Sequence, residues 1–158
     1  MYAKPLAAIL ALVLANAAYA ADTSGPASRP DPLLDRYHAA AERQDWKSAA
    51  AAMNDALGAD SRNADYHSLY AYALRRSGSS DMDIVFKHYN EALRIDPKHR
   101  GAHEYIGEAY LILGDLAKAR EHLSRLDSLC FFSCEEYRDL KKAVEQYEKK
   151  NGKTSGTR

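Results

Sequence analysis

The chain has 158 residues, and its 22 Lys and Arg balance 22 Asp and Glu, so the formal net charge is zero. This length supports one domain with a modest core. The neutral balance argues against non-specific nucleic-acid binding, which needs a surplus of basic residues to displace counterions. Glycine is sparse and Ala, Leu, Glu, Lys and Arg are abundant, which favours helices.

The first 20 residues have the features of a signal peptide. Lys4 supplies a positive charge, and residues 6–15 form an apolar run. Residues 18–20 (Ala-Tyr-Ala) follow the small-x-small pattern that signal peptidase cleaves, so we expect cleavage after Ala20. A membrane anchor is the alternative, but the run is shorter than the roughly 20 apolar residues that span a bilayer. We therefore predict a periplasmic or secreted protein that has no membrane association after cleavage.

A flexible leader is expected over residues 21–30, which are rich in Pro, Ser and Gly. The folded domain then covers residues 31–150. Within it, three consecutive segments each show two amphipathic helical patterns joined by a turn, over about 30–63, 64–99 and 100–133.

The third segment has the clearest pattern. Residues 99–126 read as two helices separated by a Gly114-Asp115 turn, and the small residues Gly107 and Ala119 are expected to face each other across the hairpin. The second segment ends in Ala-Leu-Arg-Ile-Asp-Pro (92–97), after which Pro97 stops the helix. A hairpin that recurs about every 34 residues resembles the tetratricopeptide repeat (TPR), and a generic helical bundle is the alternative.

The resemblance to TPR proteins covers about residues 30–150. Within the family, the chain resembles small exported bacterial members in general. It implies an all-α fold, a right-handed α-solenoid of three TPR helix hairpins plus a C-terminal capping helix. The first repeat departs from the family pattern, since Tyr37 replaces the small residue and Gln44 the turn glycine. The second departs in its turn at 78–81, which is two residues longer.

The capping helix is expected over residues 134–150. Ser133 followed by Glu136 forms a capping-box pattern, which predicts that the helix begins at Cys134. A final helix of this kind covers the apolar side of the last repeat. Residues 151–158 are expected to be a disordered tail.

The chain has two cysteines, Cys130 and Cys134. In an oxidising compartment, two thiols across a tight turn favour a structural disulfide. A soft-metal ligand pair and a redox-active pair remain open, although the C-x3-C spacing differs from the C-x2-C of thioredoxin-like sites.

Metal binding and catalysis have little support in the sequence. His99 and His103 are four residues apart on one helix, but no third ligand is evident. His67 and His103 occupy corresponding positions in two repeats, which favours a packing role. No phosphate loop, nucleophile elbow or zinc-protease motif is present. We therefore predict no enzyme activity, no cofactor and no metal site.

The resemblance implies a concave groove that holds a peptide or a partner helix and is lined by the first helix of each repeat. By phase, the lining residues are His38, Ser68, Tyr72, Arg75, Glu104, Glu108 and Leu111, together with Leu34 and Ala41. Arg75 is expected to pair with an acidic ligand group beside Tyr72, whereas Glu104 and Glu108 would accept basic or amide groups. An ordinary solvated face is the alternative.

These features predict a non-catalytic adaptor in the cell envelope that binds a peptide or partner protein in the concave groove. The alternative is a periplasmic copper- or zinc-handling protein that uses Cys130, Cys134 and nearby histidines. The identity of the partner and the oligomeric state stay open.

Overall fold

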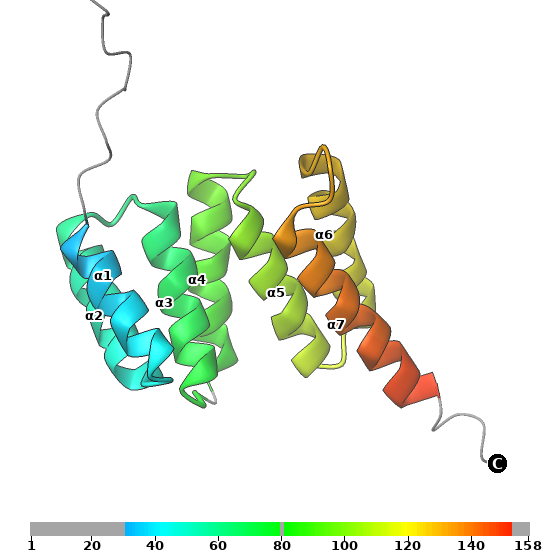
Figure 1. Ribbon diagram of the computed structural model, residues 1–158, viewed down its shortest axis with the longest axis horizontal. Helices are drawn as coiled ribbons and strands as arrows, with labels where there is room; N and C mark the ends of the chain where they lie inside the picture. Colours follow the sequence, from blue (N-terminus) through cyan, green and yellow to red (C-terminus); the bar gives the residue numbers. More distant parts are fainter. Residues whose placement is uncertain (1–30, 80, 153–158) are drawn as a thin grey trace, which may run out of the picture.

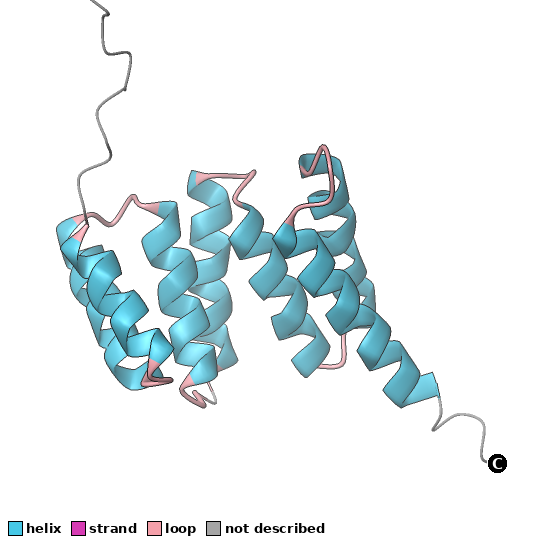
Figure 2. Ribbon diagram, viewed as in Figure 1, coloured by secondary structure: helices cyan, strands magenta, loops and turns pink. Residues whose placement is uncertain are grey.

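The computed structural model describes residues 31–79 and 81–152. The predicted signal peptide and leader, and the tail from residue 153, lie outside these residues. The described part contains seven α-helices and no strand (Figures 1 and 2). The helices are α1 (Pro32–Glu42), α2 (Trp46–Ala59), α3 (Ala64–Arg76), α4 (Met82–Ile95), α5 (Arg100–Ile112), α6 (Leu116–Leu129) and α7 (Glu135–Gly152).

The helices form three hairpins, α1–α2, α3–α4 and α5–α6, and α7 packs against the last of them. In Figure 1 the hairpins stand side by side in chain order, from α1 at one end to α7 at the other. Each hairpin contacts the first helix of the next one, because α3 packs on α2 and α5 packs on both α3 and α4. This arrangement is a solenoid, in which each unit touches only its neighbours.

The turns inside the three hairpins are built in the same way. A residue in the left-handed region ends each first helix, with φ of 57° at Gln44, 85° at Gly78 and 82° at Gly114. The N–H groups of this residue and the next donate to carbonyls of the last helical turn, which is the Schellman arrangement. Glycine suits this conformation in two repeats, whereas Gln44 adopts it with a side chain.

An aspartate then begins each second helix. The side chains of Asp45, Asp81 and Asp115 accept a hydrogen bond from a backbone N–H three residues later, as N-caps do. In the first and third hairpins this aspartate directly follows the left-handed residue. In the second, Asp81 comes two residues later than that, which agrees with the longer turn expected there.

The core divides into three apolar clusters, each shared by one hairpin and the helix that follows it. The first contains Met53, the second Tyr89 and the third Leu126, all fully buried. The third cluster has no further hairpin to complete it. Instead, α7 contributes Leu140 and Val144, which are also buried. The last helix therefore acts as the cap that the sequence predicted.

The cap explains Gly107, for which the sequence predicted a different neighbour. The atoms nearest to a Cβ placed on Gly107 belong to Leu140 of α7, and two of them lie within 2.7 Å. The side chain nearest to a Cβ on Gly107 is therefore that of Leu140, and not the Ala119 methyl group that the sequence predicted. Glycine at this position admits the side chain of the capping helix.

The ends of α7 also differ from the prediction. The helix begins at Glu135, one residue later than expected, and the carbonyl of Cys134 accepts from the N–H of Arg138. Ser133 has φ of 33° and lies outside the helix, so it is not the N-cap. At the other end α7 includes residues 151 and 152, which the sequence assigned to the tail.

Candidate functional site

Tyr72 of α3 is one of the predicted groove residues, and it lies at the centre of a row of aromatic rings. Its ring centroid is 5.5 Å from that of Trp46 on α2 and 4.3 Å from that of Tyr105 on α5. The Arg76 side chain donates to the Tyr72 hydroxyl at 2.7 Å and lies over the Trp46 ring. The row connects three helices and fixes the position of Tyr72, which stays partly exposed.

Arg75 and Glu108, which were both expected to meet a ligand, instead pair with each other. The Arg75 Nη2 atom is 2.6 Å from Oε2 of Glu108, and the side chains are only 9% and 30% exposed. This ion pair joins α3 to α5. A guanidinium held in this way already has a carboxylate partner, and an acidic ligand group would have to compete with Glu108 for it.

Ser68 was also wrongly assigned to the groove, since it is completely buried and its hydroxyl has no hydrogen-bond partner among the described residues. Leu111 is partly buried and packs against the third core cluster. His38 is exposed on α1, where its ring meets the edge of Tyr37. Of these three residues, His38 is the most exposed.

Glu104 of α5 is the predicted residue that does face a pocket. The pocket has a volume of about 280 Å³ and lies between α5 and α7. Four carboxylates line it together with Gly101 and Tyr105: those of Glu104, Glu135, Glu136 and Asp139. The first helix of the third repeat and the capping helix thus form one acidic surface.

Burial and the acidic surface raise the pKa of the Glu104 carboxyl group. Burial, followed by repulsion from Glu108, Asp139, Glu136 and Glu135, raises the pKa of Glu104 to about 8. Within the described part of the chain, Glu104 belongs to no ion pair. A carboxyl group in this position lacks the positive charge that would stabilise its ionised form.

A second pocket, of about 260 Å³, adjoins the first and shares Gly101 and Glu136 with it. Here Arg100 reaches Glu136 at 3.5 Å, and His99 meets the Asp65 carboxylate at 3.0 Å. These contacts hold the rim of the acidic pocket from α3, α5 and α7.

The contribution of α7 to this surface was not predicted from the sequence. Its acidic residues Glu135, Glu136 and Asp139 line the pocket but are not among the predicted groove residues. The signal that could have identified them is the repeat itself. If α7 packs as the first helix of a further repeat, its polar side extends the face that α5 presents.

Cys130 and Cys134 lie on either side of the loop between α6 and α7, with their Cα atoms 5.5 Å apart and their sulfur atoms in contact. Phe131 and Phe132 in this loop are 93% and 88% exposed. Among the described residues, no group of three or more His, Cys, Asp or Glu side chains is placed to hold a metal ion.

No helix in the described part of the chain is long and apolar enough to cross a bilayer. No protein-family model matches the sequence, and no curated protein matches it either.

Solved structures share the fold. The TPR2B domain of yeast Sti1, in a complex named for pHsp70, superposes with a TM-score of 0.66 at 17% identity, over 75% of this chain and 95% of that one. The Sgt2 TPR domain of Aspergillus fumigatus gives 0.66 at 22% identity, over 82% and 83%. The type III secretion translocator chaperone SycD of Yersinia enterocolitica gives 0.65 at 15% identity, over 77% and 84%.

These likenesses establish the architecture. The chain folds as an all-α, right-handed solenoid of three TPR helix hairpins followed by a capping helix.

Proposed function

We propose that this protein is a non-catalytic adaptor of the cell envelope that binds a peptide or an extended segment of a partner protein. Two structural neighbours support a binding role, since the Sti1 domain was solved in a complex and SycD is a chaperone. The binding surface is the face formed by α3, α5 and α7, where the aromatic row meets the acidic pocket.

The observation that carries the proposal is the unpaired Glu104 in a pocket with three further carboxylates. A lysine or arginine side chain that enters this pocket supplies the missing positive charge. Tyr105 lines the same pocket and offers a ring against which the aliphatic part of such a side chain packs. The partner segment is therefore basic at this position.

An acidic segment fits this face poorly. The arginine that could have bound a carboxylate is Arg75, and it is already held by Glu108. Four acidic side chains around the pocket would also repel a negative ligand. The charge of the face thus selects against acidic partners as well as for basic ones.

A peptide array followed by fluorescence anisotropy tests the proposal. The purified protein should prefer peptides that contain Lys or Arg over acidic peptides, and binding should weaken as salt increases. Glu104→Gln should weaken binding of the best peptide about 10- to 100-fold, the range expected for a hydrogen bond to a charged group.

Glu121→Gln is the matched control. Glu121 is exposed on α6 and does not line the acidic pocket, so Glu121→Gln makes the same substitution outside the proposed site. Its affinity for the peptide should equal that of the unmodified protein. Preference for acidic peptides, or equal binding by both variants, would refute the proposal.

Export and oxidation of the cysteine pair are part of the same proposal. The Cα separation of 5.5 Å suits a disulfide, which would join α6 to the cap. Intact mass spectrometry of protein recovered from its native compartment should give a chain that begins at Ala21 and is two hydrogens lighter than the dithiol form. An intact N-terminus or free thiols would contradict this part.

A further inference from the structure

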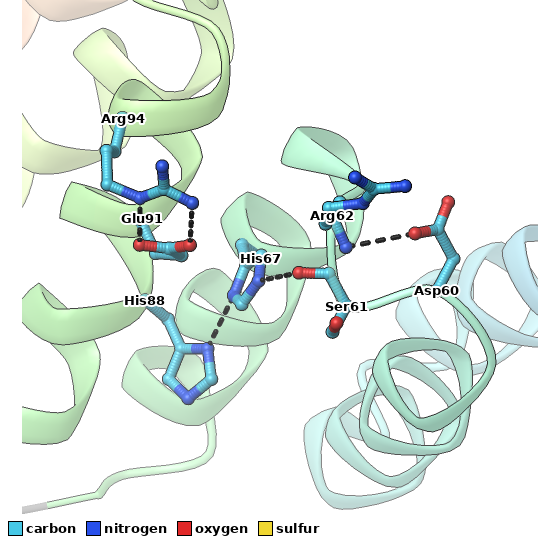
Figure 3. A network of polar contacts seen from close by, with 7 residues as sticks. All are labelled: Asp60, Ser61, Arg62, His67, His88, Glu91 and Arg94. Atoms are coloured by element: carbon cyan, nitrogen blue, oxygen red, sulfur yellow. Dashed lines mark hydrogen bonds and ion pairs between the residues drawn. The ribbon is translucent and has the colours of Figure 1, made fainter.

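His67 of α3 and His88 of α4 are hydrogen-bonded to each other inside the second hairpin (Figure 3). Their Nδ1 atoms are 2.9 Å apart. On its other side, the His67 ring places Nε2 at 3.0 Å from the carbonyl oxygen of Ser61, in the loop before α3. One chain of hydrogen bonds therefore connects this loop, α3 and α4.

The third hairpin contains the same arrangement. The Nδ1 atoms of His103 on α5 and His122 on α6 are 3.0 Å apart, and Nε2 of His103 is 3.2 Å from the carbonyl oxygen of Pro97. In both hairpins the first histidine is nearly buried, at 8% and 6% exposure. Two independent examples make this pairing a built feature of the repeats.

The carbonyl fixes where the protons are. A carbonyl only accepts, so Nε2 of His67 must carry a hydrogen and donate it to Ser61. In the neutral ring, Nδ1 of His67 then has no hydrogen and accepts from the Nδ1–H of His88. This leaves Nε2 of His88 as the free acceptor of the pair. The same assignment applies to His103 and His122.

Each pair thus has room for one extra proton but not for two. The first binds at the free Nε2 of the second histidine and leaves the Nδ1–H···Nδ1 bond in place, now strengthened by charge. The second must bind at Nδ1 of the first histidine. Both rings would then present N–H groups to each other at the same short distance, with two positive charges, and the bond would be lost.

We propose that the two histidine pairs are proton-sensitive latches, which hold α3 to α4 and α5 to α6 with no or one extra proton and release them when a second proton binds. This inference goes beyond partner binding and does not depend on it.

The groups around the pairs agree with this behaviour. The rings of Tyr70 and Tyr110 lie against the second histidine of each pair. Charged and titratable groups also face them: Lys87 and Glu91 of α4 at the first pair, and Asp96, Lys98, His99 and Arg125 at the second. Glu91, the carboxylate at the first pair, is held by Arg94.

The pKa shifts show that the folded protein binds fewer protons at these pairs than an unfolded chain does. Burial lowers the pKa of His88 and of His103, and burial with repulsion from His103 and Arg125 lowers that of His122 to about 4. An unfolded chain takes up these protons near the ordinary histidine pKa of about 6.5. Between pH 6.5 and the lowered pKa values of the folded protein, only the unfolded chain binds these protons. The free energy of unfolding therefore decreases as the pH falls through this range.

Denaturant unfolding of the full chain between pH 7.5 and 4 tests the latches. Each proton bound only by the unfolded chain raises the unfolding constant tenfold per pH unit. At least one proton fewer per pair in the folded state means that the two pairs contribute at least about 100-fold per pH unit below pH 6. This contribution is the difference in pH dependence between the unmodified protein and a variant that lacks both pairs. His88→Asn with His122→Asn should remove this contribution, because an asparagine amide presents either its N–H or its oxygen to the neighbouring ring.

His38→Asn is the control, since His38 is exposed and lies outside both pairs, and it should retain the full contribution. NMR titration of the histidine ring protons in the unmodified protein gives a second readout that needs no variant. The folded protein should bind at most one proton per pair and lose its structure as the second binds. Complete titration of all four paired histidines, in a chain that stays folded, would overturn the proposal. So would an unchanged pH dependence in a folded double variant.

Discussion

Gly107→Ala tests the close approach between α5 and the capping helix. A Cβ at this position would lie 2.5 Å from Cδ2 and 2.7 Å from Cδ1 of Leu140, and 3.2 Å from its Cγ. Methyl ends of a side chain often move aside, but Leu140 is fully buried in the third core cluster. The added methyl group therefore forces α7 or the Leu140 rotamer to shift.

Two opposing effects determine how much Gly107→Ala changes the free energy of unfolding. Replacing glycine by alanine inside a helix stabilises it by up to about 1 kcal/mol. Overpacking a filled core costs about 1–3 kcal/mol. The free energy of unfolding should therefore stay equal or fall by up to about 2 kcal/mol. Gly58→Ala separates the two effects, because nothing lies within 4 Å of a Cβ on that residue of α2.

Urea denaturation of both variants provides the measurement. Gly58→Ala should raise the free energy of unfolding by roughly 0.5–1 kcal/mol, and the two variants should differ by the overpacking cost. An unchanged slope against urea would show that both still unfold as the same unit. If Gly107→Ala stabilised the protein as much as Gly58→Ala, α7 would not be seated against Gly107 as described.

Three further predictions concern charges and the cysteine pair. Glu108→Ala leaves a buried arginine without its partner and should lower the free energy of unfolding by about 2–3 kcal/mol. Glu91→Ala breaks an exposed ion pair and should lower it by less than about 1 kcal/mol. Equal losses in urea denaturation would contradict this prediction. Reducing the Cys130–Cys134 pair should lower the melting temperature, by an amount equivalent to about 2 kcal/mol in the chain-entropy model, and an unchanged melting temperature would show that the pair does not restrain the chain. Glu104→Gln should leave stability unchanged near pH 4 and raise it by roughly 1–2 kcal/mol at pH 8, which parallel denaturation at the two pH values would measure.

The sign of the last prediction follows from the direction of the pKa shift. The pKa of Glu104 is raised to about 8 in the folded protein, whereas an exposed glutamate titrates near 4.5. The folded state therefore binds a proton more tightly than the unfolded state. The contribution of Glu104 to stability is therefore highest below pH 4.5 and is lost as the pH rises towards 8. Glutamine does not titrate, so the variant avoids this loss.

The helices and their order could be predicted because they depend on local pattern. The Gly114-Asp115 turn and the proline after α4 mark helix ends directly in the sequence. Even Gln44, which departs from the turn glycine, takes the same left-handed conformation. The position of the cap was also predictable, since α7 carries one apolar face that includes Leu140.

The lining of the groove could not be predicted as well as the helices. The position of a residue in the repeat indicates which face of a helix it lies on, but not which side chains lie across from it. Ser68 and Glu104 occupy corresponding positions in successive repeats. One is completely buried and the other lines a pocket. Likewise, Arg75 and Glu108 are 33 residues apart, and only the stacking of α3 on α5 brings their charges together.

Glu104 also shows how a binding residue can be told from a structural one. A carboxylate buried among like charges destabilises the fold at neutral and higher pH, so a purely structural role would favour glutamine there. A role in binding a basic side chain instead requires the acid. Glu104→Gln should therefore have opposite effects in two assays, with higher stability at pH 8 and weaker peptide binding. If the variant lost both stability and affinity, Glu104 would be supporting the fold. If it gained stability and kept its affinity, the acidic pocket would not be the binding site.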